Sequence, residues 1–492
     1  MQNCRKRLKV NKLTQQLKKM LSTFKQRYSI YLLIALFFLF KLNHLHLPYF
    51  WDELGVYARA ALQMFDHKIS LMPDAIPPEL SRGHPLLCTV IFSAGFRIFG
   101  PHVWAGHLIA LLWSCGLLYL LYRFARDFFD QQTALLASAL LAVQPVFIAQ
   151  SSMVLPEIML AFFCTATIYA YLQKQFWLVA LFSSLAILTK ETAVVLPVSL
   201  GLPILLTILR NGISRKKLTE LGLISVPLVI WGIFLLIQKV QNGWFFFPLH
   251  TGYVSFSWQD IIPRISYYLS FLGKGQGRYM WTAVTIAAAI LFLRNNSNLL
   301  KKKAVAFFAA EPEQSPFVII LLYTAIALAV SALNFHLARY ILLVMPVLCC
   351  LIAAQLMYII NNFKISRPHY LLLPFLAVSF FYYKGNIFNI DADMSYADIV
   401  VAQKEIIMRL NQQADASAII GADFPVAHGL MDKRAGYSAF SYETVLSCSS
   451  SEADYVITSS FDHCKPDAGT ILLQESKTSL VSIQLYKNTL KK

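Results

Sequence analysis

The sequence predicts a polytopic α-helical membrane protein with about 11–13 transmembrane helices and a small C-terminal α/β domain. Three observations predict this fold class. The 492 residues are 57% hydrophobic and 14% charged. Apolar runs of spanning length recur between short polar loops, and the mean hydropathy is +0.54. The composition turns polar near residue 385. The net charge of +17 does not indicate nucleic acid, because the basic residues lie mostly in loops, where they suit anionic lipid headgroups.

The first 27 residues hold nine Lys or Arg side chains and no carboxylate. The apolar run that follows has no small-residue cleavage site, so we expect an uncleaved first helix rather than a signal peptide. The stretch 85–99 is short and contains Arg97, and we expect a helix lying in the outer interface. Spans of about 20 residues are expected at 28–46, 103–122, 132–151, 157–173, 175–190, 192–209, 219–238, 279–293, 316–335, 340–360 and 369–384.

This assignment agrees with the positive-inside rule. The basic residues of its cytoplasmic loops are Arg123, Arg126, Lys174, Arg210, Arg215, Lys216, Lys217, Arg294, Lys301, Lys302, Lys303, Lys364 and Arg367. The predicted parts are a basic cytoplasmic N-terminus (1–27), a transmembrane domain (28–384) with outer loops at 47–102 and 239–278, and an extracytoplasmic domain (385–492). In that domain we expect a helix at 396–413 and strands at 418–420, 455–458, 471–473 and 480–486. Cys448 and Cys464 could pair if the domain lies outside.

Asp52 and Glu53 are the first two acidic residues of the chain, and they follow the first span on its outer side. Carboxylates beside lipid are costly, so we interpret both as catalytic groups of an outer-face active site. Glu157, after Pro156, returns to the same face and is a third candidate. Each has an ordinary structural explanation as well, since Asp52 can cap a surface helix and Pro-Glu is a common helix start.

Cations at the outer ends of the apolar helices form a second group of candidates. They are Arg82, His84, Lys190, Arg278 and Arg339. Such side chains often snorkel or form structural ion pairs, and Lys190 with Glu191 is the pair for which we most expect this. Together the group suits a phosphate at headgroup depth. No zinc-type spacing of Cys or His occurs. Three carboxylates leave room for a divalent metal, but nothing indicates one, and no cofactor is expected.

A series of short motifs resembles the GT-C glycosyltransferases, most closely the protein O-mannosyltransferase and bacterial aminoarabinose transferase family. The motifs are Asp52-Glu53, His84-Pro85, Pro156-Glu157, Leu188-Thr189-Lys190-Glu191 and Arg339-Tyr340, and the resemblance covers approximately residues 30–360. In that family an acidic residue at the position of Asp52 serves catalysis, and the first outer loop contains surface helices. The chain departs from the common His-Pro-Pro pattern, with Leu86 after Pro85. It also lacks the large inserted lumenal domain of the eukaryotic members.

The resemblance implies a glycosyltransferase that moves a sugar from a polyprenyl-phosphate donor to a lipid, glycan or protein hydroxyl. Asp52 would be the general base, the cations would hold the donor phosphate, and Tyr57 and Tyr340 would contact the sugar or the lipid. The short tail favours a bacterial inner membrane, with a cytoplasmic N-terminus and a periplasmic C-terminal domain. The main alternative is a lipid or sugar transporter or flippase. A transporter is expected to have charges in the middle of its spans and internal repeats. The sequence shows few such charges and no repeat.

Overall fold

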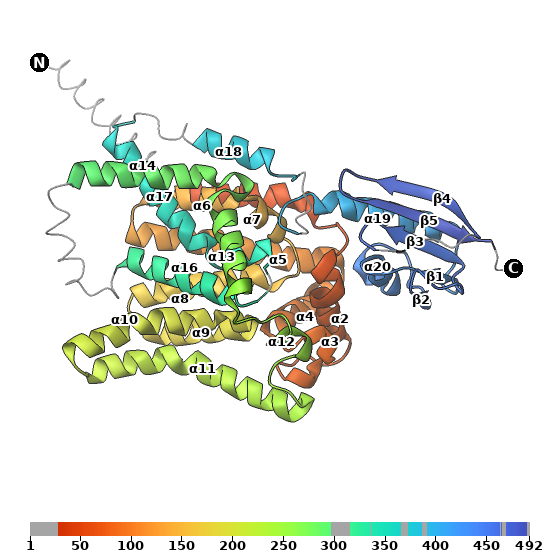
Figure 1. Cartoon of the computed structure of the whole chain (residues 1–492), viewed down its shortest axis with the longest axis horizontal. Coiled ribbons are helices and arrows are strands. Elements are labelled where there is room, and N and C mark those ends of the chain that lie inside the picture. Colours follow the sequence, from red (N-terminus) through yellow and green to blue (C-terminus); the bar gives the residue numbers. More distant parts are fainter. Residues whose placement is uncertain are drawn as a thin grey trace, which may run out of the picture.

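The computed structural model describes residues 28–296, 315–334, 336–365, 372–385, 391–462, 464 and 469–489. Most of these residues belong to a helical bundle, with the C-terminal domain at one end (Figure 1). The short helices of residues 47–102 lie at that same end, and the turn between α10 and α11 lies at the other. These short helices are η2 (Glu53–Tyr57), α2 (Ala58–Asp66), η3 (Pro73–Ala75), α3 (Pro78–Ser81) and α4 (Leu87–Phe99).

The bundle follows the predicted spans closely. Its helices are Tyr28–His44, α5 (Val103–Phe128), α6 (Gln131–Ala142), α7 (Pro145–Gln150), α8 (Pro156–Leu172), α9 (Phe176–Thr189), η4 (Glu191–Val194), α10 (Val195–Asn211), α11 (Arg215–Asn242), α12 (Pro248–Thr251), α13 (Trp258–Gly273), η5 (Gly275–Gly277), α14 (Tyr279–Asn296), α16 (Pro316–Ser331), η7 (Ala338–Leu343), α17 (Met345–Asn362) and α18 (Leu372–Phe381). Among the described residues, four helices are long and apolar enough to cross a membrane, and several shorter apolar helices accompany them.

Local sequence signals explain where these helices begin and end. The Asp130 carboxylate caps α6 by accepting hydrogen bonds from the backbone N–H groups of Gln132 and Thr133. Pro156 occupies the first turn of α8, where its missing N–H costs nothing. Gly243 ends α11 in the left-handed conformation, with φ +82°.

Several segments differ from the prediction; the span expected at 340–360, for example, is η7 followed by α17. The span expected at 132–151 is two helices, because Pro145 starts α7 and interrupts the hydrogen-bond ladder of α6. The predicted outer loop 239–278 contains a 16-residue helix, α13, capped by the Ser257 hydroxyl. The sequence of this helix mixes aromatic and polar residues and therefore resembles that of a loop.

The C-terminal domain is the predicted small α/β unit. Its elements are α19 (Tyr396–Asn411), β1 (Ile419–Gly421), α20 (Val426–Met431), η9 (Lys433–Ala435), β2 (Thr444–Leu446), β3 (Tyr455–Ser459), β4 (Thr470–Lys477) and β5 (Ser482–Asn488). The strands form one sheet in the order β2-β1-β3-β5-β4, with parallel pairs on the β1 side and antiparallel pairs on the β5 side. Helix α19 packs against β4 and β5. Prediction missed only the three-residue strand β2 and the short helices.

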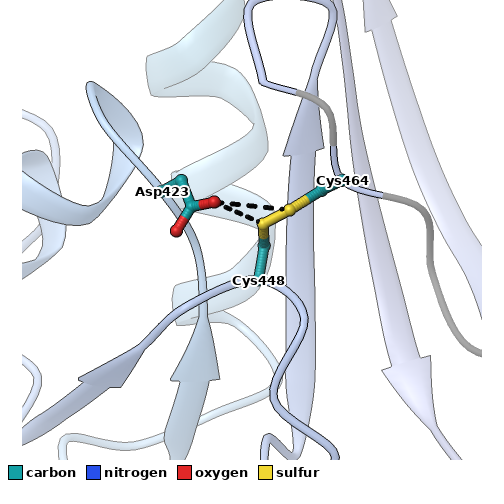
Figure 2. Close-up of side chains that lie close together, drawn as sticks. All are labelled: Asp423, Cys448 and Cys464. Carbon is teal, nitrogen blue, oxygen red and sulfur yellow. Dashed lines mark hydrogen bonds between the residues drawn. A yellow bond between two sulfur atoms is a disulfide. The ribbon is translucent and has the colours of Figure 1, made fainter.

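A disulfide joins Cys448, after β2, to Cys464, after β3 (Figure 2). The sequence left this pairing open. The Asp423 carboxylate points at both sulfur atoms, with one oxygen 2.7 Å from Cys448 Sγ and 3.4 Å from Cys464 Sγ. The disulfide therefore ties together the loops at the end of the sheet from which Asp423 and Phe424 also project.

The C-terminal domain is docked on the segment 47–102 through backbone hydrogen bonds and an ion pair. Tyr49 N–H donates to the Ala435 carbonyl at 3.1 Å, and the Tyr437 hydroxyl donates to the Tyr49 carbonyl at 2.8 Å. Arg434 forms an ion pair with Asp66 at 2.8 Å. The domain is therefore fixed to the segment that immediately precedes Asp52.

Candidate active site

The centre of the site is the guanidinium of Arg339, which lies at the start of η7 and is buried. It donates hydrogen bonds to carboxylates from three distant parts of the chain: Nη2 to Asp52, Nε to Glu157 at 3.3 Å and Nη1 to Asp391. A single guanidinium can serve all three because its N–H donors form a planar fork. The three carboxylates differ in accessibility, since the side chain of Asp52 is 25% exposed and those of Glu157 and Asp391 are each 4% exposed.

A second cation lies on the other side of Glu157. The Lys190 ammonium donates to Glu157 Oε1 at 3.1 Å and lies 4.4 Å from the centre of the Tyr340 ring. Lys190 directly follows α9, and its backbone is extended, with φ −159° and ψ 135°. Glu157 is thus clamped by Lys190 and Arg339, and its second carboxylate oxygen has no hydrogen-bond partner among the described residues.

The backbone conformation before Asp52 is unusual. Trp51 has a left-handed φ of +46°, which a non-glycine residue adopts only where its surroundings enforce it. Its ring packs edge-on against Phe424 and Phe461 of the C-terminal domain, with centroids 5.2 and 5.5 Å apart. A Cβ on Gly55 would lie 2.9 Å from the Phe424 ring, so only glycine fits there. The domain therefore holds the turn that carries Asp52.

Glu53 points away from Asp52. Its carboxylate is buried and accepts hydrogen bonds from Val154 N–H at 2.6 Å, Phe50 N–H at 3.1 Å and the His107 ring at 2.9 Å. Consecutive side chains at the start of a helix point in different directions around its axis, which explains why the two adjacent carboxylates face different surroundings. Glu53 connects the segment 47–102 to α5 and to the residues before α8.

Asp52, Glu157, Lys190 and Arg339 line a small cavity of about 80 Å³. Arg82, His84, Tyr57 and Tyr340 also line it. A larger groove of about 590 Å³ adjoins this cavity and shares Arg82, His84 and Glu191 with it. Most of the residues that line the groove are aliphatic or aromatic, and they include Trp231, Phe256 and Leu333.

Comparisons with known proteins agree with this architecture. Residues 83–244 match the family model described as dolichyl-phosphate-mannose-protein mannosyltransferase. Two crystal structures of ArnT from Cupriavidus metallidurans are similar over the whole chain. The apo form has a TM-score of 0.58 at 13% identity and covers 94% of this chain and 98% of its own. The form bound to undecaprenyl phosphate has a TM-score of 0.56 at 15% identity and covers 93% and 97%. The chain has the fold of a GT-C glycosyltransferase.

A curated relative gives a shorter match. It is an uncharacterized protein of Aquifex aeolicus, 30% identical over 179 residues, which are 34% of this chain and 33% of the relative. The chain thus matches about a third of the length of that relative. The GT-C fold that the sequence motifs predict is confirmed.

The GT-C fold brings together most of the predicted site residues, with two exceptions. Glu53 lies outside the cavity, as described above. Arg278 is also outside it and is buried, where it donates to the carbonyl of Phe271 and to the side chains of Gln144 and Gln276. The turn before Arg278 contains Gln276 with φ +49°, and this turn directs the guanidinium into the bundle instead of toward the pocket.

The expected ion pair between Lys190 and Glu191 does not form. Glu191 bonds His84 instead, at 2.8 Å, while Lys190 bonds Glu157. The reason is the extended backbone at Lys190, because successive side chains of an extended chain point to opposite sides. His250 from α12 lies beside this pair, with its ring centre 5.0 Å from that of His84. Burial and the neighbouring His84 lower the pKa of His250 to about 4, so this ring is neutral at pH 7.

Prediction missed Asp391, the third carboxylate on Arg339. A signal for it existed, because Asp391 and Asp393 follow the last apolar helix much as Asp52 and Glu53 follow the first. Placing a domain boundary at 385 assigned both residues to a soluble tail. Burial raises the pKa of Asp391 to about 6, although the Arg339 charge acts in the opposite direction.

Among the described residues, the compact group of three metal-ligating side chains is Asp423, Cys448 and Cys464 (Figure 2). The two sulfur atoms are joined in a disulfide and so are not the thiolates that bind metals. The group therefore serves the structure of the C-terminal domain.

Proposed function

We propose that this protein is a membrane glycosyltransferase that moves a sugar from a polyprenyl-phosphate donor to an acceptor hydroxyl on the extracytoplasmic side. One observation carries the proposal: a partly exposed carboxylate, Asp52, shares a cavity with Lys190, Arg339 and Arg82, and that cavity adjoins an apolar groove. The ArnT structure bound to undecaprenyl phosphate supports a lipid-phosphate donor. The acceptor is a lipid, glycan or protein hydroxyl, and the membrane is a bacterial inner membrane with the C-terminal domain in the periplasm.

The groove and the cavity match the two parts of such a donor. Aromatic and aliphatic side chains of the groove, including Trp231 and Phe246, provide an apolar surface for an isoprenoid chain. Arg82 lines both spaces and stands where the phosphate would join the lipid to the sugar. An arginine suits this place because its fork of donors binds two phosphate oxygens at once.

Asp52 is the proposed general base. In the transfer step the acceptor hydroxyl gives its proton to the Asp52 carboxylate while its oxygen forms a bond to the anomeric carbon of the sugar. The bond from that carbon to the phosphate oxygen breaks, and its electron pair stays with the phosphate. Direct displacement inverts the configuration of the anomeric carbon. Glu157, fixed between Lys190 and Arg339, is placed to orient sugar or acceptor hydroxyls.

The cations lower the barrier because the phosphate gains negative charge as the sugar leaves. Lys190 and Arg339 are fixed by buried hydrogen bonds before the substrate arrives, so they stabilise the developing charge without reorganising. The interaction is stronger in the transition state than with the bound donor, which is the condition for raising kcat. Tyr57 and Tyr340 provide ring faces for the sugar or the first isoprene units.

The test uses purified protein and a panel of polyprenyl-phosphate sugars, with release of lipid phosphate and formation of the glycosidic product as the two readouts. Asp52→Asn should lower the transfer rate by about 10²- to 10⁴-fold, the usual contribution of a general base. Asp74→Asn is the matched control, because Asp74 is an exposed carboxylate of the same loop outside the cavity. Transfer by Asp52→Asn at the parent rate would refute the assignment. Movement of labelled lipid across liposomes without product would favour a transporter.

A further inference from the structure

We propose that Asp391 is a positioning residue: its buried carboxylate holds the Arg339 guanidinium from the side facing away from the cavity, so that Arg339 keeps its place when Asp52 engages an acceptor hydroxyl. The inference rests on the proposed glycosyl transfer and deepens it. It also connects the segment that leads into the C-terminal domain to the active site through Asp391 alone.

The first argument is the arrangement of partners around Arg339. Asp52 and Glu157 line the cavity, whereas Asp391 does not. Asp391 bonds Nη1, the terminal nitrogen that Asp52 leaves free. Because Asp52 must leave Arg339 at least in part to accept a proton from substrate, a second carboxylate is needed to keep the guanidinium from following it. Asp391 is in the right place to do this and has no access to substrate itself.

The second argument is that the segment holding Asp391 is itself held by buried side chains of the bundle. The Gln150 amide donates to the Asp391 carbonyl at 2.8 Å, and the Gln276 amide donates to the Ala392 carbonyl at 2.7 Å. All three of Asp391, Ala392 and Gln150 are buried. Two glutamines from α7 and η5 thus provide donors for a chain segment that carries no regular structure, and burying these polar groups would be costly without such pairing.

The third argument concerns Arg278, which the cavity does not use. Its guanidinium donates to Gln276 Oε1 at 3.3 Å, which fixes the orientation of the amide that holds Ala392. A continuous hydrogen-bonded series therefore runs from Arg278 through Gln276 and the 391–392 backbone to Asp391 and Arg339. Lys41 of the first helix adds a contact at the other end of the segment, with Nζ 3.7 Å from Met394 Sδ. Arg278 is a buried cation with no carboxylate partner among the described residues, and this series gives it a structural role.

The charged and titratable groups that face Asp391 are Arg339, Asp52 and Glu157, and the Tyr396 hydroxyl is near enough to be affected by its charge. The ionised carboxylate is the form that pairs with Arg339. Since burial raises the pKa of Asp391 to about 6, this form is present above that pH and is lost as the pH falls through it. The parent enzyme should therefore lose kcat below about pH 6.

The experiment compares Asp391→Asn with Asp393→Asn in the full-length protein. Asp393 is a buried carboxylate of the same segment that accepts from Ser395 N–H at 2.9 Å and makes no bond to Arg339, so it controls for damage to the segment. Asp391→Asn should lower kcat about 100-fold, as expected for a displacement of about 1 Å at a catalytic group. It should also abolish the loss of kcat near pH 6, and Asp391→Glu should restore part of the rate. Asp393→Asn should keep both the rate and the pH profile.

A readout independent of turnover separates this inference from the proposed function. Cryo-EM maps of the parent and of both variants should show the Arg339 guanidinium displaced in Asp391→Asn and unmoved in Asp393→Asn. An unmoved guanidinium in Asp391→Asn, or the same pH profile in that variant and the parent, overturns the positioning role. If the parent transfers no sugar from any donor, the proposed function fails, and the maps still decide whether Asp391 holds Arg339.

Discussion

Glu53→Gln should damage stability more than chemistry, the reverse of what Asp52→Asn does. In Glu53→Gln the amide oxygen can replace Oε1, which accepts from Val154 N–H and from the His107 ring. The amide nitrogen then replaces Oε2 and faces the Phe50 N–H, which loses its acceptor. One unsatisfied buried donor costs about 1–3 kcal/mol. Glu53→Ala removes the acceptor of Val154 N–H, of Phe50 N–H and of the His107 ring, and three times that figure gives about 3–9 kcal/mol.

The assay measures thermal unfolding of the purified protein by intrinsic fluorescence, together with the transfer rate per folded molecule. The melting temperature should fall in the order parent, Glu53→Gln, Glu53→Ala, while Asp52→Asn stays near the parent because Asp52 is partly exposed. The transfer rate of Glu53→Gln should remain well above that of Asp52→Asn. The reasoning is refuted if Glu53→Gln unfolds at the parent temperature yet loses transfer as completely as Asp52→Asn. Glu53 would then be a chemical group, as the sequence first predicted.

Two further predictions concern the entrance and the C-terminal domain. Arg82→Ala should raise KM for the donor about tenfold and should also lower kcat, because the phosphate that Arg82 is proposed to bind gains negative charge in the transition state; an unchanged kcat would contradict this. Replacing Cys448 and Cys464 together by Ser opens a loop whose ends are 16 residues apart and should destabilise the domain by about 3 kcal/mol, measured by urea unfolding. The same double variant should also lower the transfer rate, because Phe461 packs against Trp51, and an unchanged rate would show that this packing does not affect the site.

The sequence predicted which residues line the cavity better than it predicted which of them pair with one another. Topology decides on which face a residue at the end of a span lies, and this is why Asp52, Glu157, Lys190 and Arg339 were expected together and lie together. Pairing depends on backbone angles at single residues, which hydropathy does not encode. The extended conformation of Lys190 sends that side chain and Glu191 to different partners.

Arg278 and Asp391 show the same limit of sequence-based prediction: Arg278 was expected in the site and lies outside it, whereas Asp391 was not expected and contacts Arg339. Arg278 lies where an apolar helix begins, as the other cations of the site do, but a left-handed turn at Gln276 directs it into the bundle. Asp391 lies in a sequence that reads as the start of a soluble domain, yet its segment is buried between α7 and η5. The contacts that place Asp391 join segments more than 100 residues apart, and the position of Arg278 depends on one dihedral angle. A local sequence pattern predicts neither.

The ion-pair cluster around Arg339 explains why Asp52 is the carboxylate that is partly exposed. In this cluster Asp52, Glu157 and Asp391 carry three negative charges, against two positive charges on Lys190 and Arg339. An incoming donor phosphate must therefore compete with a carboxylate for Arg339, and the one with freedom to move is Asp52, at 25% exposure against 4% for the others. Donor binding would then release Asp52 from its ion pair at the moment when a base is needed, and without donor the carboxylate would stay paired. The same arginine thus links occupation of the donor site to activation of the base, and this link requires Arg339 to be held by a partner other than Asp52.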